Sequence, residues 1–309
     1  MTRYCIALFS IGTLFCVTQA YAASLPVCPP ADGVAIQVLG SGGPIADDGR
    51  ASSSYLIWVD GKSRVLIDAG GGSFLRFGEA RGSFLDLDFI GLSHFHADHS
   101  ADFPALLKSG NFSGRKRPLT VAGPSGNGRF PALQAYLASM IGANDGAYAY
   151  LSGYLDGSGG LAPLLQQEIS ADSSLTQDLL GSSDDIAITA MRVPHGIVPA
   201  VAFRVDVRGT SFVFASDQNG SDDDFAKFAQ DASVLVMHMP IAEDTTDGAL
   251  QLHAIPSKIA AIASIAGADQ LLLSHFMARS LKNLDDNVQI VRDGFTGGLV
   301  VAEDLLCQL

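Results

Sequence analysis

One short segment limits what this chain can fold into more than any other: residues 93–100, which read SHFHADHS. It holds three of the seven histidines, His94, His96 and His99, together with Asp98. Imidazole is polar, so crowding it into one loop adds nothing to a hydrophobic core. Two histidines two positions apart project to one side of an extended loop and can bind one ion. Asp98 and His99 follow on the turn and can reach a second ion, so the segment predicts a metal centre for which Zn²⁺ is well suited.

Apolar, β-branched runs lead into this segment and predict strands over residues 33–43, 53–70 and 87–93. Residues 101–110 then have helical spacing, with Pro104 early in the helix, where its missing N–H does no harm. The cluster is therefore predicted to lie on a loop between a strand and a helix.

A second set of predicted strands follows, each ending at a polar residue of chemical interest. These strands cover residues 185–195, 200–209, 210–217, 233–240 and 269–276, and a helix is predicted over 257–268. His195, Asp217 and His275 lie at strand ends and are the candidates for the remaining ligands, with Asp217 placed to bridge two ions. His238 also ends a strand, and either supports the site or is an ordinary polar strand end. Two strand-rich halves with helices predict an α/β fold in which two β-sheets pack together with helices outside.

The chain begins with the pattern of a signal peptide. Residues 1–22 combine Arg3, an apolar run and the small-residue cleavage motif Ala20-Tyr21-Ala22. We expect residues 23–309 to form one domain with an inserted cap or lid over about 125–185; the alternative is that this insert is an inert surface elaboration. We therefore expect an exported protein, periplasmic or secreted, with no membrane anchor after cleavage.

Charge and cysteines give two further expectations. After removal of residues 1–22, 18 basic and 32 acidic side chains remain, a net charge of −14 that repels polyanions overall. Cys28 and Cys307 are the cysteines left, near the two ends of the mature chain. In an oxidising compartment they would form a disulfide; the alternative is two unrelated thiols.

Taken together, these motifs resemble the metallo-β-lactamase fold hydrolases. The match rests on the H-x-H-x-D-H pattern from His94 to His99. Further segments are most similar to the branch that contains ribonuclease Z and bacterial arylsulfatase-like enzymes: VLGSGGP, SSSYLI, VLIDAG, the PHG at His195, FVFASD and LLLSHFMARS. The resemblance extends from about Gly33 to Leu299, apart from the middle insert. It implies an αββα sandwich of two mixed sheets with helices on the outer faces.

The resemblance also implies a two-metal site and the role of each ligand. Carried over by position, one divalent ion, expected to be Zn²⁺, is held by His94, His96 and His195. The second is held by Asp98, His99 and His275, and Asp217 bridges the two. Asp68 resembles the buried family aspartate that orients a ligand histidine; the alternative is an aspartate in an ordinary strand-end turn.

His253 matches a histidine that serves the family as proton donor. Its usual partner is a glutamate directly after a strand-end histidine, and here Met239 stands in that place. Glu243 and Asp244 would substitute for it only if their loop folds back. The family's Ser-Gly-Asp-Thr is altered to Ala-Ser-Asp-Gln around Asp217, so we expect a changed substrate pocket rather than lost metal.

The expected activity is hydrolysis of a small ester, an aryl sulfate or a phosphodiester, by a hydroxide shared between the two ions. Asp98 and His253 are the expected catalytic residues, Asp98 orienting the nucleophile and His253 protonating the leaving group. The interval between His195 and Asp217 has 21 residues and leaves no room for the family's tRNA-gripping arm. The lack of room for this arm and the net negative charge of the chain both argue against a tRNA substrate.

Three alternatives stay open at this level: a lactonase, a β-lactamase-type hydrolase of the same fold, and a non-catalytic periplasmic module that binds metal and captures an anion. Met239 favours the non-catalytic binding module, whereas the complete set of predicted ligands argues against such a module. The oligomeric state is open, with a homodimer as one option.

Overall fold

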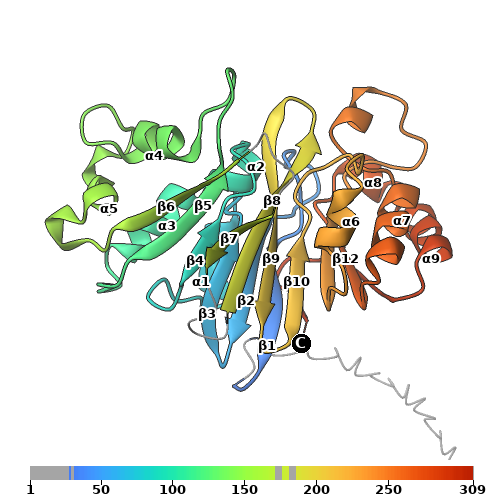
Figure 1. Ribbon diagram of the computed structural model, residues 1–309, viewed down its shortest axis with the longest axis horizontal. Helices are drawn as coiled ribbons and strands as arrows, with labels where there is room; N and C mark the ends of the chain where they lie inside the picture. The colour runs from blue at the N-terminus through green and yellow to red at the C-terminus, as the bar shows by residue number, and fades with distance from the viewer. Residues whose placement is uncertain (1–27, 29–30, 171–175, 181–185, 309) are drawn as a thin grey trace, which may run out of the picture.

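Two seven-stranded β-sheets pack face to face, with helices on their outer sides (Figure 1). The computed structural model describes residues 28, 31–170, 176–180 and 186–308. The predicted signal peptide, residues 1–22, lies outside the described residues. The predicted α/β sandwich is confirmed.

The first sheet has the strand order β14-β1-β2-β3-β4-β5-β6. Its strands are β1 Val34–Gly40, β2 Ser54–Val59, β3 Lys62–Ile67, β4 Phe89–Gly91, β5 Leu119–Pro124, β6 Leu164–Ile169 and β14 Cys307–Gln308. β2 and β3 form a hairpin whose two turn residues, Asp60 and Gly61, both have positive φ, as a two-residue hairpin turn requires. From β3 to β6 the strands are parallel, so their carboxyl ends meet at one edge.

The second sheet has the order β13-β12-β11-β10-β9-β8-β7. Its strands are β7 Gln177–Leu180, β8 Ile186–His195, β9 Val198–Val207, β10 Thr210–Phe214, β11 Val234–His238, β12 Gln270–Ser274 and β13 Gly298–Val301. β8 and β9 form a long antiparallel hairpin, and the strands from β10 to β13 are parallel. Here too, the carboxyl ends of parallel strands lie at one edge of the sheet.

Helices connect the strands on the outer sides. The α-helices are α1 Ser73–Glu79, α2 Ala97–Ser100, α3 Phe103–Gly110, α4 Leu133–Ile141, α5 Gly153–Asp156, α6 Asp224–Phe228, α7 Pro256–Ala266, α8 Ala278–Leu281 and α9 Leu284–Gly294. Short 3₁₀ turns cover η1 Ala149–Leu151, η2 Ser158–Gly160 and η3 Gly248–Gln251. α3 and α7 each have a proline in the first two positions, where no helical N–H partner is required.

The alternation of strand residues divides the core in two. In β2, Tyr55 and Ile57 enter the core between the sheets, which also takes in α6, α7 and α9. Leu56 and Trp58 point the other way, into the core that packs against α1, α3 and α4. Every residue of β2 is buried because both of its faces are covered.

The segment predicted to be a cap, about 125–185, contributes α4 and α5 and also supplies an edge strand to each sheet. β6 pairs with β5 in the first sheet and β7 pairs with β8 in the second. Residues 171–175 and 181–185 of this segment lie outside the described residues. The division into signal peptide, domain and cap stays a prediction.

One stretch, Gly248–Ala266, is long and apolar enough to cross a membrane by length and composition. It consists of η3, a break at residues 252–255, and α7. The inner face of α7 lies in the core between the second sheet and its helices, where Ile259 and Ala263 are buried. We therefore assign this stretch to the packed interior.

A disulfide joins Cys28 to Cys307, as the oxidised alternative predicted. It ties the start of the described chain to β14, which pairs with β1 at the edge of the first sheet. The two ends of the domain are therefore held together covalently.

Candidate metal centre

The predicted ligands all lie where strands end, on the shared edge of the two sheets. His94 and His96 follow β4, and Asp98 and His99 lie on α2 directly after them. The other three come from the second sheet: His195 ends β8, Asp217 follows β10 and His275 follows β12. The structure thus brings all seven predicted ligands together.

Backbone strain accompanies several of these strand ends. Asp68, Ser216 and His275 have φ values of 59°, 58° and 56°, in the left-handed region that side chains other than glycine rarely adopt. Such strained residues gather at functional sites, where the surrounding structure holds them. Gly70 is constrained differently, because a Cβ there would meet the carbonyl oxygen of Asp98 at 2.1 Å.

His94, His96 and His195 form one group. The Nε2 of His94 lies 3.1 Å from the Nδ1 of His96, and the ring of His195 lies 5.0 Å from that of His94. The Nδ1 of His195 donates to the carbonyl of Leu252 at 2.9 Å. This bond fixes the tautomer and leaves the buried Nε2 as a free lone pair without a hydrogen-bond partner.

Asp98, His99 and His275 form the second group. The Nε2 of His275 lies 3.2 Å from the Nε2 of His99 and 3.1 Å from a carboxylate oxygen of Asp98. Asp217 lies between the groups: its oxygens are 3.4 Å from His275 Nε2, and 3.7 Å from both His99 Nε2 and His195 Nε2. This is the position that a bridging carboxylate requires.

Asp68 supports the second group from behind. Its carboxylate lies 2.8 Å from Nδ1 of His99 and accepts hydrogen bonds from the backbone N–H and hydroxyl of Ser93. Because Nδ1 of His99 is engaged, its Nε2 is directed into the centre. Asp68 therefore contacts a predicted ligand as the resemblance implied.

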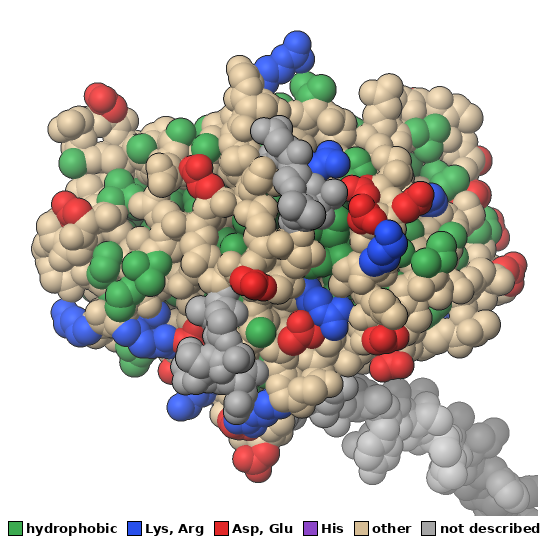
Figure 2. All heavy atoms as spheres, viewed as in Figure 1, with side chains coloured by type: hydrophobic (Ala, Val, Ile, Leu, Met, Phe, Trp, Pro, Cys, Tyr) green, Lys and Arg blue, Asp and Glu red, His purple; other side chains and the backbone are tan. Residues whose placement is uncertain are grey.

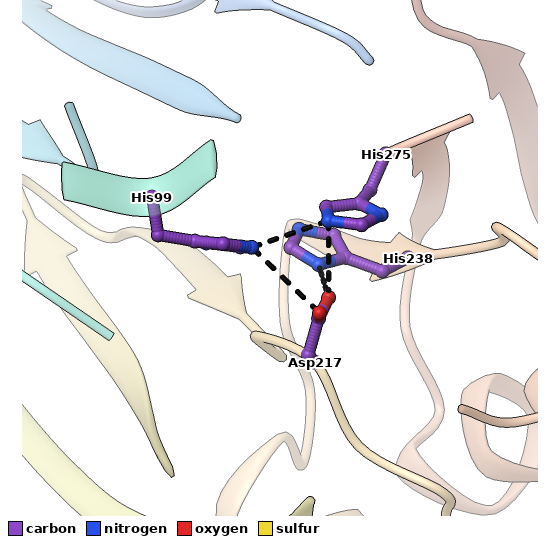
Figure 3. Close-up of side chains that lie close together, drawn as sticks. All are labelled: His99, Asp217, His238 and His275. Atoms are coloured by element: carbon purple, nitrogen blue, oxygen red, sulfur yellow. Dashed lines mark hydrogen bonds and ion pairs between the residues drawn. The ribbon is translucent and has the colours of Figure 1, made fainter. Parts of the chain in front are cut away.

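His238 belongs to the centre, although the sequence left its role open. Its Nδ1 lies 2.7 Å from Asp217, and it converges with His99 and His275 on that carboxylate (Figure 3). On the other side, its Nε2 lies 3.1 Å from the hydroxyl of Tyr55, a fully buried residue of β2. Tyr55 could not be predicted from the sequence, because it lies within an apolar strand with no motif around it that indicates a site.

His253 lies beside the centre, between η3 and α7. Its Nδ1 is 3.9 Å from Asp217 and has no hydrogen-bond partner among the residues that the structure describes. Met239, in place of the family glutamate, is buried. Glu243 does not take over that role, because its carboxylate accepts from the backbone and hydroxyl of Ser257 at the start of α7.

The residues present fit divalent cations. Ring nitrogens face one another at 3.1 and 3.2 Å, and two carboxylates lie among them. Buried lone pairs at this spacing repel unless a cation or a proton lies between them. Three groups of these residues have ligand atoms within 4.8 Å of one another: His94, His96 and His195; His99, Asp217, His238 and His275; and His195, Asp217 and His253. Metal binding by the individual residues stays a prediction.

The pKa values follow from burial and from the two carboxylates. Burial and neighbouring imidazoles lower the pKa of His94 well below its ordinary value, and burial lowers the pKa of His253 to about 3. Burial also opposes charge on His99, but Asp68 and Asp98 raise its pKa well above the ordinary value. For Asp98, burial is outweighed by His99 and His275, which lower its pKa. Burial therefore keeps His94 and His253 neutral, whereas the carboxylates around His99 favour its charged form and Asp98 stays ionised.

A cavity of about 430 Å³ opens onto this cluster. Predicted ligands and His253 form its floor, and Pro44, Leu252, Met277 and Arg279 form its walls. The predicted catalytic residues Asp98 and His253 therefore face the same space.

Comparisons with known proteins identify the family. A family model described as "Beta-lactamase superfamily domain" matches residues 63–276, more than half of the chain. Among curated relatives, the ribonuclease Z of Methanosarcina acetivorans is 25% identical over 296 residues, covering 88% of this chain and 96% of the relative. That of Methanosarcina mazei is 26% identical, covering 87% and 95%.

Solved structures show the same fold. The metallo-β-lactamase fold protein YhfI from Bacillus subtilis has a TM-score of 0.69 at 22% identity, covering 90% of this chain and all of its own. The short form of human tRNase Z has a TM-score of 0.68 at 19% identity, covering 89% and 98%.

These relatives correct one expectation from the sequence. A small-ester hydrolase that does not act on tRNA was expected, from net charge and from the short interval after His195. The curated relatives that span nearly the whole chain are ribonucleases Z, so this expectation is wrong. The curated relatives named above are ribonucleases Z, not arylsulfatases.

Proposed function

Because this chain belongs to the β-lactamase superfamily, whose metallo-β-lactamase fold members are metal-dependent hydrolases, we propose that it is a two-metal phosphodiesterase that cleaves RNA. The observation that carries the proposal is the meeting of two ligand groups on Asp217 within one open cavity. The names of the ribonuclease Z relatives support RNA as the substrate.

Zn²⁺ is the ion that we propose for both positions. Neutral imidazole and carboxylate suit Zn²⁺, and the donor set offers five histidines and two aspartates. His94, His96 and His195 would hold one ion, and Asp98, His99 and His275 the other, with Asp217 between them. Two divalent ions supply an activated water and neutralise charge that develops on the phosphate.

Asp98 orients the attacking group in this proposal. Its pKa is held low, so the carboxylate is ionised at neutral pH and accepts a hydrogen bond. Its side chain is 7% exposed and faces the cavity, where a substrate would meet it.

His253 donates a proton to the leaving oxygen. Its pKa of about 3 keeps it neutral in the free protein, so its affinity for a proton must rise when an anionic substrate binds. The phosphodiester is negatively charged, and negative charge also builds on the leaving oxygen. Both raise the pKa of a nearby imidazole. No acidic side chain stands in the place of Met239 to assist, so the substrate itself has to supply the charge.

RNA binding has to use surfaces other than the interval after His195. β9 and β10 occupy that interval, so no separate arm extends from it. Acidic and basic side chains are interspersed over the face in Figure 2, so the net negative charge is not concentrated there. Net charge alone is therefore a poor guide to what the cavity binds.

Export stays a proposal. Pairing of Cys28 with Cys307 supports maturation in an oxidising compartment, where structural disulfides persist.

The experiment that tests the function uses a 5′-labelled RNA hairpin with a single-stranded 3′ extension. The protein, loaded with Zn²⁺, should cleave within or next to the extension, and chelator should abolish cleavage. The His94→Ala variant should lose activity, because it removes a predicted ligand. If the loaded protein cleaves bis-p-nitrophenyl phosphate but no RNA, RNA is the wrong substrate. If it cleaves neither, the phosphodiesterase assignment fails.

A further inference from the structure

The loop between β5 and α4, residues 125–132, lies at the most open side of the predicted ligand set. His96 is half-buried, whereas His94 and His195 are almost completely buried. The ring of Phe130 lies 6.2 Å from the ring of His96, edge-on at 64°. Phe130 is itself partly exposed. Phe130 therefore places a partly exposed aromatic ring next to His96, which lines the cavity.

Asn127 holds this loop in one conformation. Its side-chain oxygen accepts from the backbone N–H groups of Arg129 and Phe130 at 2.9 and 3.0 Å, and its own N–H donates to the carbonyl of Phe130. Its amide nitrogen donates to the carbonyl of Ile197, on the turn between β8 and β9, at 2.9 Å. The loop thus rises beside the β8–β9 turn (Figure 1), and both are fixed next to His195.

A glycine makes the close turn at the base of this loop. A Cβ on Gly126 would lie 2.4 Å from the backbone nitrogen of Ala132 and 2.6 Å from the carbonyl oxygen of Phe130. The two ends of the loop therefore approach closely, and this turn fixes the backbone position of Phe130.

Arg129 precedes Phe130 at the tip of the loop. It is exposed, and the ion pairs found within residues 31–170, 176–180 and 186–308 do not engage its guanidinium. A guanidinium on the residue that precedes a partly exposed aromatic ring suits a single nucleic-acid strand, in which each base offers a face for stacking and each phosphate a charge.

We infer that residues 125–132 form a substrate platform, on which Phe130 stacks against the base flanking the scissile phosphate and Arg129 pairs with a neighbouring phosphate. This rests on the proposed function, and it names single-stranded RNA as the part of the substrate that enters the cavity. A ring that merely shields His96 from water would make no such contact with a base.

Binding to a fluorescent RNA tests the platform without any catalytic step. The probe is a single-stranded RNA octamer that contains 2-aminopurine, whose fluorescence is quenched by stacking, and the protein is kept in chelator. Wild type should quench the probe on binding. Phe130→Leu keeps an apolar side chain but removes the stacking face, so it should lose the quench and bind about tenfold more weakly. Phe130→Tyr should behave as wild type.

Arg129→Gln gives a separate prediction. The quench should persist, while the slope of log Kd against log salt should fall by about 0.7, the value for one phosphate contact on a single strand. Phe112→Leu is the matched control. Phe112 is also an exposed phenylalanine, but it follows α3 and its ring packs against Lys108 of that helix. This variant should change neither quench nor salt dependence.

An abasic octamer separates stacking from general damage to the fold. If Phe130 contacts a base, Phe130→Leu should have no added effect on binding to the abasic RNA. An equal loss on both RNAs would overturn the inference, as would an unchanged quench in Phe130→Leu while wild type cleaves RNA. If zinc-loaded wild type cleaves no RNA, the proposed function fails first, and the platform fails with it.

Discussion

At the scale of single residues, Tyr55 and His238 extend the centre beyond the residues that motifs indicate. The hydroxyl of Tyr55 contacts His238, which in turn contacts Asp217. Groups that hold a ligand in place tune metal affinity, and losing one typically costs 10- to 100-fold. Asp217 is the point at which both predicted ion positions meet, so its orientation matters for both.

We expect Tyr55→Phe to weaken Zn²⁺ binding about tenfold, because His238 loses a partner and Asp217 a fixed position. Competition titration with a chromophoric chelator measures this. Tyr154→Phe is the matched control, since Tyr154 is another buried tyrosine, with its hydroxyl on the carbonyl of Leu107. Equal affinities for the two variants would show that the contact has no role in the centre.

His253→Ala should lower kcat for RNA by about 100-fold or more, in the range of a lost proton donor, while metal content stays at the wild-type level. Metal analysis of the same preparation provides the control. A kcat that survives the substitution would remove His253 from the mechanism.

The low pKa of His253 also predicts how stability depends on pH. The ordinary pKa of histidine is about 6.5, whereas that of His253 in the folded chain is about 3. Between these values the unfolded state binds a proton that the folded state does not, so stability falls as pH drops below about 6.5. This one group contributes about 1.4 kcal/mol of loss between pH 7.5 and 5.5.

Urea unfolding in chelator at pH 7.5 and 5.5 measures that loss. His253→Gln cannot bind the proton in either state, so its stability should fall less than that of wild type over the same interval, by about 1.4 kcal/mol. An identical fall in both proteins would place the pKa of His253 near its ordinary value.

The sequence predicted much at this scale. The gathering of the candidate ligands could be predicted because strands of both sheets end in polar side chains, and side chains at the carboxyl ends of neighbouring strands meet at one edge. Their binding of metal stays a prediction. The role of Tyr55 could not be predicted, because its hydroxyl contacts His238 only after β2 and β11 pack face to face. Whether His238 supports the site or is an ordinary polar strand end could not be decided for the same reason.

At the scale of elements, strands β1 to β4, α3, α7 and the hairpin of β8 with β9 were predictable from period and turn residues. The edge strands β6, β13 and β14 were not. They are short, and their place depends on pairing with β5, β12 and β1 rather than on a pattern of their own. β14 is also held by the disulfide at Cys307.

We expect Cys307→Ser to lower the free energy of unfolding by up to about 4 to 5 kcal/mol, because the disulfide closes nearly the whole chain into a loop. Guanidinium unfolding measures this, and reductant should destabilise wild type similarly. The main-chain bond from Val38 to the carbonyl of Leu306 remains and limits the loss. Wild type that unfolds identically with and without reductant would contradict a structural role for the disulfide.

At the scale of the whole molecule, two sheets bring strand ends from both halves of the chain to one edge, and the centre is built there. Fold class and metal centre followed from local patterns, but substrate did not. Net charge describes the whole surface, whereas substrate binding depends on the shape and the side chains of the cavity. That is why an expectation argued from charge was wrong.

The most direct test of a two-metal ribonuclease is a titration of the metal-free protein with Zn²⁺, following both bound metal and cleavage of single-stranded RNA. We predict that two ions bind per chain and that cleavage appears as the second position fills. A protein that holds two ions and cleaves no RNA, or one whose RNA cleavage persists in chelator, would contradict it.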